Sequence, residues 1–192
     1  MTTSFTANDL VRELPSGSSI QYGPQNDRIY LMFLGSEAPE NLSYELIEMA
    51  KLSRYSKVFA KAPEQQAKPF VTNEYVEEAR VPGFYAGQND ALFFGYYFDP
   101  ARAVEHNTET LDFATLPEWL GNRFARHLLA RMEQEMKAKG IKTTYTIARA
   151  ASPGINSTFG RAGYHFSGRL KNNTNISGSI ESMNVWHKSL AH

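Results

Sequence analysis

The chain has 192 residues, enough for one domain with a buried core or for two small domains. It carries 20 lysines plus arginines and 20 aspartates plus glutamates, so its formal net charge is +0 and no whole-chain field would hold nucleic acid or an anionic membrane. It has no cysteine, which excludes disulfides, a thiolate nucleophile and thiolate-bound metals.

The amino-terminal residues 1–19 are polar and lack the apolar run of a signal peptide. The longest apolar stretches, such as residues 91–98, are much shorter than the ~20 residues that cross a bilayer. We therefore expect a cytoplasmic protein that contacts neither membrane nor nucleic acid. The histidines show no i,i+4 pairing and no nearby set of ligands, so no metal site is predicted.

Hydrophobic periodicity predicts alternating strands and helices in the first half of the chain. An apolar run at 29–34 indicates a buried strand, and apolar residues spaced by three and four indicate an amphipathic helix over 41–53. The elements expected after them are a strand at 57–62, a short helix at 65–73, and strands at 76–81 and 90–98. Residues 99–108 are interpreted as a linker.

The second half is predicted to follow the same order. It comprises a strand at 111–116, a helix over 124–136 stopped by Gly140, a strand at 143–148, a short helix at 155–162, and strands at 164–170 and 183–187 around a polar loop at 171–182.

This similarity between the halves indicates an internal repeat. Phe70 and Tyr75 stand five residues apart before the last strand pair of the first half, as do Phe159 and Tyr164 in the second. We expect an α/β fold with a mixed sheet flanked by helices, built from two similar half-domains. The predicted divisions are a polar tail at 1–18 and half-domains at 19–100 and 105–192. Exposed edges of the half-domains are compatible with a homodimer.

Residues 111–129 (LDFATLPEWLGNRFARHLL) read as a strand, a turn with proline and glycine, and a helix. This stretch resembles the pyrophosphate loop of the GNAT superfamily of acyl-CoA-dependent N-acetyltransferases. The unpaired N–H donors and partial positive charge of a helix amino terminus suit the pyrophosphate of coenzyme A. An ordinary strand-to-helix turn is the alternative.

Longer motifs extend the resemblance over nearly the whole chain. The chain is similar to the beta-lysine N-acetyltransferase family in the leading segments 20–24 (IQYGP), 26–32 (NDRIYLM) and 81–85 (VPGFY), and in the carboxyl-terminal segments 144–150 (TYTIARA), 154–164 (GINSTFGRAGY), 168–178 (GRLKNNTNISG) and 181–186 (ESMNVW). The resemblance implies a GNAT-like fold and transfer of an acetyl group from acetyl-CoA to the side-chain amine of beta-lysine or a similar small diamino acid, giving a compatible solute.

The resemblance also implies site residues. Glu109 matches the family's acidic position and is the first candidate for the general base, with Asp112 the second, although either carboxylate could instead be a solvated strand end. The backbone of Ala114, Thr115 and Leu116 is expected to pair with the pantetheine amides. The remaining candidates for cofactor binding are Gly121, Asn122, Arg123, Phe124, Ala125 and Asn156. Asn156 could also be a helix cap.

The polar loop offers a substrate site. Asn172, Asn173, Asn175 and Glu181 could bind the amino-acid end of a substrate through amides and a carboxylate, and a solvated hairpin loop is the alternative. The superfamily's tyrosine acid corresponds to Phe159, which has no proton to give, so the acid that protonates the thiolate is unassigned.

The chain departs from the family pattern in two places. The superfamily's loop glycine is replaced by Arg123, whose side chain could instead reach a phosphate oxygen. The strands and helices that begin the family's acetyltransferase domain have no counterpart between the leading segments and residue 111. A catalytically inactive, shortened relative that acts as a binding or scaffold module is therefore the alternative function.

Overall fold

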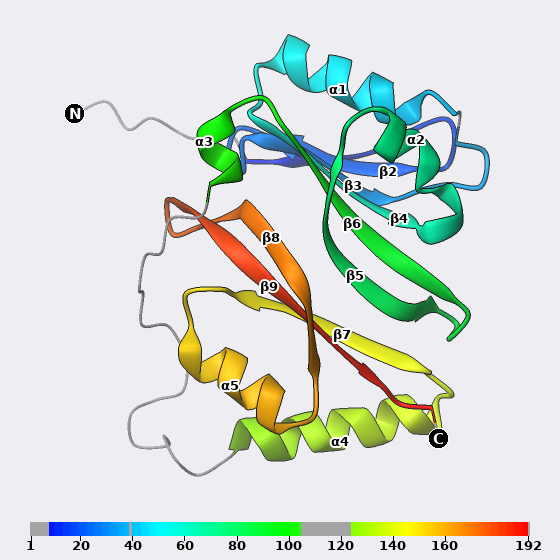
Figure 1. The fold of residues 1–192 in the computed structure, drawn as a ribbon, viewed down its shortest axis with the longest axis vertical. Helices are drawn as coiled ribbons and strands as arrows, with labels where there is room; N and C mark the ends of the chain where they lie inside the picture. The colour runs from blue at the N-terminus through cyan, green and yellow to red at the C-terminus, as the bar shows by residue number, and fades with distance from the viewer. Residues whose placement is uncertain (1–7, 39, 105–123, 192) are drawn as a thin grey trace.

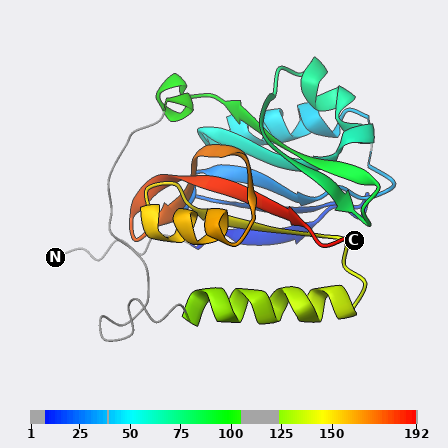
Figure 2. The same cartoon turned by 60° about the horizontal axis from the view of Figure 1, so that its bottom comes forward.

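The computed structural model describes residues 8–38, 40–104 and 124–191, which form one continuous sheet with helices on its outer sides (Figures 1 and 2). The elements up to residue 104 are β1 (Leu10–Glu13), β2 (Ser19–Gly23), β3 (Arg28–Phe33), α1 (Leu42–Ser53), β4 (Lys57–Pro63), the 3-10 turn η1 (Glu64–Gln66), α2 (Lys68–Thr72), β5 (Val76–Tyr85), β6 (Asn89–Tyr97) and α3 (Pro100–Ala103). The later elements are α4 (Phe124–Ala138), β7 (Thr143–Arg149), α5 (Pro153–Arg161), β8 (His165–Ile176) and β9 (Ser179–Ser189).

The sheet order is β1-β2-β3-β4-β6-β5-β8-β9-β7. Among these strands β3 and β4 pair in parallel, and the other neighbouring pairs are antiparallel. The mixed sheet with flanking helices confirms the expected GNAT-like α/β class.

The order of the strands in the sheet also shows a repeat between the two halves of the chain. In the first half β6 lies between β4 and β5, and in the second half β9 lies between β7 and β8, with antiparallel pairing in both cases. The ring pair Phe70–Tyr75, with centroids 5.3 Å apart, occupies the place that Phe159–Tyr164, at 5.4 Å, takes in the second half. The strand expected at 111–116 lies outside the described residues.

Three expectations need correction. The segment 171–182 is not a loop, because β8 continues to Ile176 and β9 starts at Ser179. The expected amino-terminal tail contributes the edge strand β1, and the expected linker contains α3. Contacts with other parts of the chain, rather than their own hydrophobic pattern, hold these segments in regular structure. β1 pairs with β2, and Arg102 of α3 bonds the backbone of β8.

Successive side chains of β4 point to opposite faces of the sheet, and each face carries its own hydrophobic cluster. Val58 and Ala60 face α1, where they meet Leu46 and Phe94 in the first cluster. Phe59 lies in a second cluster that includes Leu170 and Val185 of the second half, so this cluster joins the two halves. Burial of apolar area in this second cluster stabilises the contact between the halves.

The halves meet where β5 lies beside β8, with Ala79 opposite Gly168. A Cβ on Gly168 would lie 2.2 Å from the Glu78 carbonyl oxygen, and its φ of +142° is one that other residues rarely adopt. Glycine is therefore required for β8 to come this close to β5.

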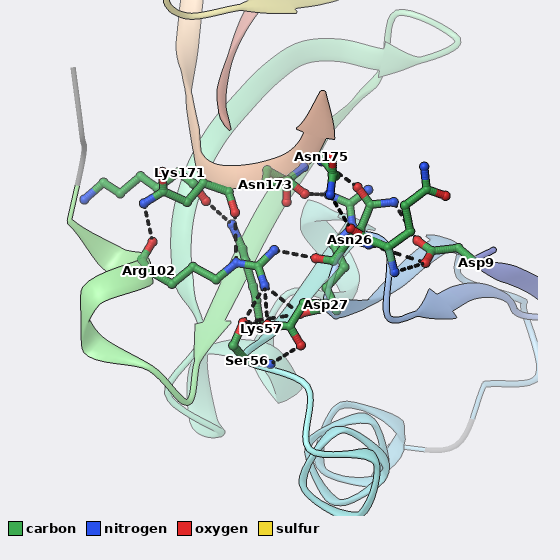
Figure 3. Close-up of polar contacts among 12 residues, drawn as sticks. Asp9, Asn26, Asp27, Ser56, Lys57, Arg102, Lys171, Asn173 and Asn175 are labelled. Carbon is green, nitrogen blue, oxygen red and sulfur yellow. Dashed lines mark hydrogen bonds and ion pairs between the residues drawn. The ribbon is translucent and has the colours of Figure 1, made fainter. Parts of the chain in front are cut away.

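Three buried cations of the first half bind the backbone of β8 (Figure 3). Lys57 Nζ donates to the carbonyl of Lys171 at 2.8 Å, Arg102 Nε donates to that of Asn172 at 2.9 Å, and Arg28 donates to that of Asn173. These three consecutive carbonyls lie where β8 and β9 are out of register, between Leu170 and Thr174. Cations from another part of the chain thus replace ladder bonds that a regular hairpin would make.

Glu78 supplies the buried counter-charge. Its carboxylate lies 3.0 Å from Lys57 Nζ, and the side chains of Lys57 and Glu78 are 0% and 1% exposed. Burial lowers the pKa of Lys57 to about 8, against the opposing effect of Glu78. Burial, with the nearby charge of Arg102, also lowers the pKa of Arg28 to about 10. The cluster is therefore strongly desolvated and depends on its internal partners.

Replacing Lys57 by methionine should destabilise the protein by ~3–5 kcal/mol, because it leaves the Glu78 carboxylate buried without its cation. Chemical denaturation of the wild-type protein and of Lys57→Met would measure this loss. The matched control is Lys51→Met, whose partner Glu48 is exposed and whose loss should cost less than ~1 kcal/mol. Equal losses for the two variants would contradict the importance of the buried pair.

Candidate functional site

Most of the residues predicted to bind the cofactor or to catalyse lie in one segment of the sequence. Those outside the described residues are Glu109, Asp112, Ala114, Thr115, Leu116, Gly121, Asn122 and Arg123. Phe124 is the first residue of α4. The described part of the predicted cofactor site therefore consists of the start of α4 and of α5 with the strand between them.

A cleft of about 250 Å³ lies between α4, β7 and α5. Ala125 and Leu128 line it from α4, Thr146 from β7, and Ile155 and Phe159 from α5. The apolar residues of α4 recur at helical spacing, which turns one side of the helix toward β7. The cleft is therefore mainly apolar and runs along α4, from Ala125 near its start to Met136. That Ala125 contacts a cofactor there stays a prediction.

Asn156 fixes the start of α5. Its amide nitrogen donates to the carbonyls of Arg149 and Ser152 at 2.9 and 2.7 Å. Its oxygen accepts hydrogen bonds from Asn184 Nδ2 at 2.9 Å and from Trp186 Nε1 at 2.8 Å. The side chain thus ties the turn between β7 and α5 to β9. It shapes the wall of the cleft, while direct contact with a cofactor stays a prediction.

The sequence analysis missed Asn184 and Trp186 as site residues. They alternate with Val185 along β9, so both lie on the side of the strand that faces α5. Their separation from Asn156 in the sequence, 28 and 30 residues, gives no local pattern that could reveal the contact. The family resemblance includes the segment 181–186, and the pattern there predicts a strand, but neither indicates that these two side chains contact Asn156.

Glu181 pairs with Arg149. The guanidinium donates to both carboxylate oxygens, at 2.7 and 2.5 Å, and the two side chains are 6% and 16% exposed. This bidentate pair neutralises the carboxylate. The backbone carbonyl of Arg149 also accepts a hydrogen bond from Asn156 Nδ2. Arg149 therefore connects Glu181 with the start of α5.

The three asparagines predicted to bind substrate all lie on β8 and contact the first half (Figure 3). Asn172 Nδ2 donates to the carbonyls of Arg102 and Val104 at 3.0 and 2.7 Å. The backbone N–H of Asn175 donates to Asn26 Oδ1 at 2.8 Å, and its side-chain amide donates to the Gln25 carbonyl at 2.8 Å. The structure therefore brings Asn172, Asn173 and Asn175 together at the junction, and their binding of substrate stays a prediction.

Within residues 8–38, 40–104 and 124–191 no helix is long and apolar enough to span a membrane. In the same ranges no three His, Asp or Glu side chains gather where they could hold a metal ion.

Comparison with known proteins identifies relatives. No family model matches the chain. It is 26% identical to a beta-lysine N(6)-acetyltransferase of Methanococcus maripaludis over 264 aligned positions, which cover 89% of this chain and 96% of that relative. Because 264 exceeds the 192 residues of the chain, that relative contains residues without a counterpart here.

Two more relatives match parts of the chain. A beta-lysine N(6)-acetyltransferase of Methanosarcina mazei is 38% identical over 84 residues, 44% of this chain and 31% of that protein. The N-acetyltransferase YodP of Bacillus subtilis is 32% identical over 150 residues, 76% of this chain and 53% of that protein. All three relatives are named acetyltransferases, which gives no support to an inactive binding module. The chain is thus similar to beta-lysine N(6)-acetyltransferases and to another N-acetyltransferase, and these similarities support an N-acetyltransferase.

Proposed function

We propose that the protein transfers an acetyl group from acetyl-CoA to the side-chain amine of beta-lysine or a similar small diamino acid. The observation that carries this proposal is the match to the Methanococcus maripaludis enzyme over 96% of that enzyme's length. The name of the Methanosarcina mazei relative points to the same substrate. The candidates for the polar amino-acid end of such a substrate are Asn172, Asn173, Asn175 and Glu181, although Asn172, Asn175 and Glu181 bond other parts of this chain.

The cleft between α4 and α5 fits the cofactor's chemistry. Its apolar lining, including Leu128 and Phe159, suits the methyl and methylene groups of pantetheine, and the helix ends beside it suit phosphate. Ala125 and the start of α5, fixed by Asn156, would flank the bound cofactor. Acetyl-CoA supplies the activated acetyl thioester, and the chain supplies binding, orientation and removal of the amine's proton.

Removal of that proton requires a base. An alkyl amine with a pKa near ~10.4 is neutral in only about one molecule in 2,500 at pH 7. Glu109 is our first candidate to accept the proton and Asp112 our second. Glu181 is less suited, because both of its oxygens already accept hydrogen bonds from Arg149 and are not free to take a proton from the amine.

Filling the cleft tests the cofactor site. In Ala125→Trp the indole should occupy the space between α4 and α5 and weaken acetyl-CoA binding about tenfold or more, or ~1.4 kcal/mol. Calorimetric titration of the purified protein with acetyl-CoA measures this. The matched control is Ala130→Trp, at an exposed position of α4 outside the cleft lining. Unchanged affinity in Ala125→Trp would place the cofactor elsewhere.

The base is tested separately. Glu109→Gln removes the proton acceptor with little change of shape, so the rate of acetyl transfer should fall by about 10²–10⁴-fold while acetyl-CoA binding stays near the wild-type value. Steady-state rates with beta-lysine, together with calorimetry on the same samples, measure both quantities. Turnover at the wild-type rate would remove Glu109 from this role, and Asp112→Asn would then be measured in the same way.

The contact between β9 and α5 should affect cofactor binding more than chemistry. Trp186→Phe removes the N–H that bonds Asn156 Oδ1, at a cost of ~1 kcal/mol, and should raise the KM for acetyl-CoA about fivefold with little change in kcat. Phe166→Leu is the control, because Phe166 contacts the Trp186 ring without taking part in the hydrogen bond. Equal KM values in the two variants would contradict the idea that the hydrogen bond from Trp186 to Asn156 supports acetyl-CoA binding.

A further inference from the structure

We propose that Lys61 of β4 is a modification site, where the chain itself becomes acetylated by a thioester such as acetyl-CoA. The uncharged amine attacks the thioester carbonyl and the carbon–sulfur bond breaks. The nitrogen loses a proton to the departing thiolate, so the products are an N-acetyl-lysine amide and a free thiol. The inference does not depend on the acetyl transfer proposed above, because a thioester reacts with any accessible uncharged amine.

Lys61 lies on the side of β4 that is turned away from α1. Its neighbours Ala60 and Ala62 belong to the cluster that packs against α1. Because side chains alternate along a strand, Lys61 points to the other side, as Phe59 of the second cluster does. In the pairing of β4 with β6, Lys61 stands opposite Phe93, which also belongs to the second cluster. The stem of the lysine is therefore set among aromatic side chains.

The amine of Lys61 lies over an aromatic ring. Its Nζ is 5.1 Å from the centroid of the Phe84 ring, and that ring contacts the Tyr145 ring with centroids 4.9 Å apart. Within residues 8–38, 40–104 and 124–191, no hydrogen bond or ion pair joins Nζ to a partner. Lys61 is half-buried, so part of its surface is open to a reagent. The amine thus combines apolar neighbours with access from solvent.

These surroundings favour the uncharged form of the amine. Burial lowers the pKa of Lys61, whereas at Lys57 the nearby Glu78 opposes the effect of burial. The nucleophile in acetylation is the uncharged amine, so a lowered pKa increases the reactive fraction of Lys61 near neutral pH. The Phe84 ring attracts the ammonium form and works against this increase, but an aromatic face holds a cation less strongly than a carboxylate does.

Other lysines lack one part of this combination. Burial also lowers the pKa of Lys57, to about 8, but the Lys57 side chain is 0% exposed and a thioester has no access to it. Lys51 is exposed, but its hydrogen bond to Glu48 raises its pKa and keeps the amine protonated. Lys61 is partly exposed, and its pKa is lowered. Access and desolvation together therefore assign the modification to Lys61.

The test incubates the purified full chain with isotope-labelled acetyl-CoA and follows each lysine by peptide mass spectrometry. At about pH 8, Lys61 should be acetylated about threefold or more faster than Lys68, an exposed lysine of α2 that is measured in the same sample. Lys57 should stay unlabelled while the chain is folded. In Lys61→Arg the label at this position should disappear while that at Lys68 is unchanged, and in Lys68→Arg the label at Lys61 should be unchanged.

Two controls separate the folded surroundings of Lys61 from other causes. In guanidinium chloride, where the fold is lost, Lys61 and Lys68 should react at nearly equal rates. The acetyl thioester of N-acetylcysteamine, which lacks the nucleotide of coenzyme A, should show the same preference for Lys61 in the folded chain. Equal rates in the folded chain, a preference that persists after unfolding, or a preference seen with acetyl-CoA alone would each overturn the inference. None of these outcomes bears on acetyl transfer to beta-lysine, which is assayed separately.

Discussion

The junction between the halves depends on three buried cations that hold one stretch of backbone. Lys57, Arg28 and Arg102 come from three separate elements of the first half and bind three consecutive carbonyls of β8. Desolvated cations are costly unless partners surround them, so the halves must dock in one arrangement to satisfy them. The hairpin that carries the predicted substrate residues is consequently held by the amino-terminal half.

The two halves have the same topology and different chemistry. Both insert their last strand between two earlier ones, and both leave a cleft between their helices. In the second half the cleft is apolar and narrow, and a network of Asn156, Asn184 and Trp186 fixes one wall. In the first half the cleft is larger, about 500 Å³, and Glu40 and Lys68 both line it. The same order of elements therefore surrounds two clefts of different chemistry.

Packing against the sheet also differs between the halves. α1 buries Leu42, Leu46 and Ala50 against the first core. In α4, by contrast, Leu128 is 64% exposed and Met132 is 44% exposed within the described residues. The first half is therefore more tightly packed around its first helix than the second half is. Binding sites are drawn from such less tightly packed regions, because a ligand needs surface that the protein has not already covered.

The sequence by itself determined the order of elements and the repeat, because hydrophobic periodicity is local and survives without tertiary contacts. The strand at Arg28–Phe33, the helix at Leu42–Ser53 and the Phe–Tyr spacing before each final strand pair were all readable from it. The prediction of acetyltransferase activity came from the resemblance to a known family. Segment 171–176 was misjudged because residues 28, 57 and 102, far away in the sequence, bind its backbone, and segment 10–13 was misjudged because its order comes from pairing with β2 and not from its own pattern. Only the tertiary structure could bring Asn156 to Trp186, Glu181 to Arg149 and three cations to β8, since buried polar groups must find partners wherever the fold places them.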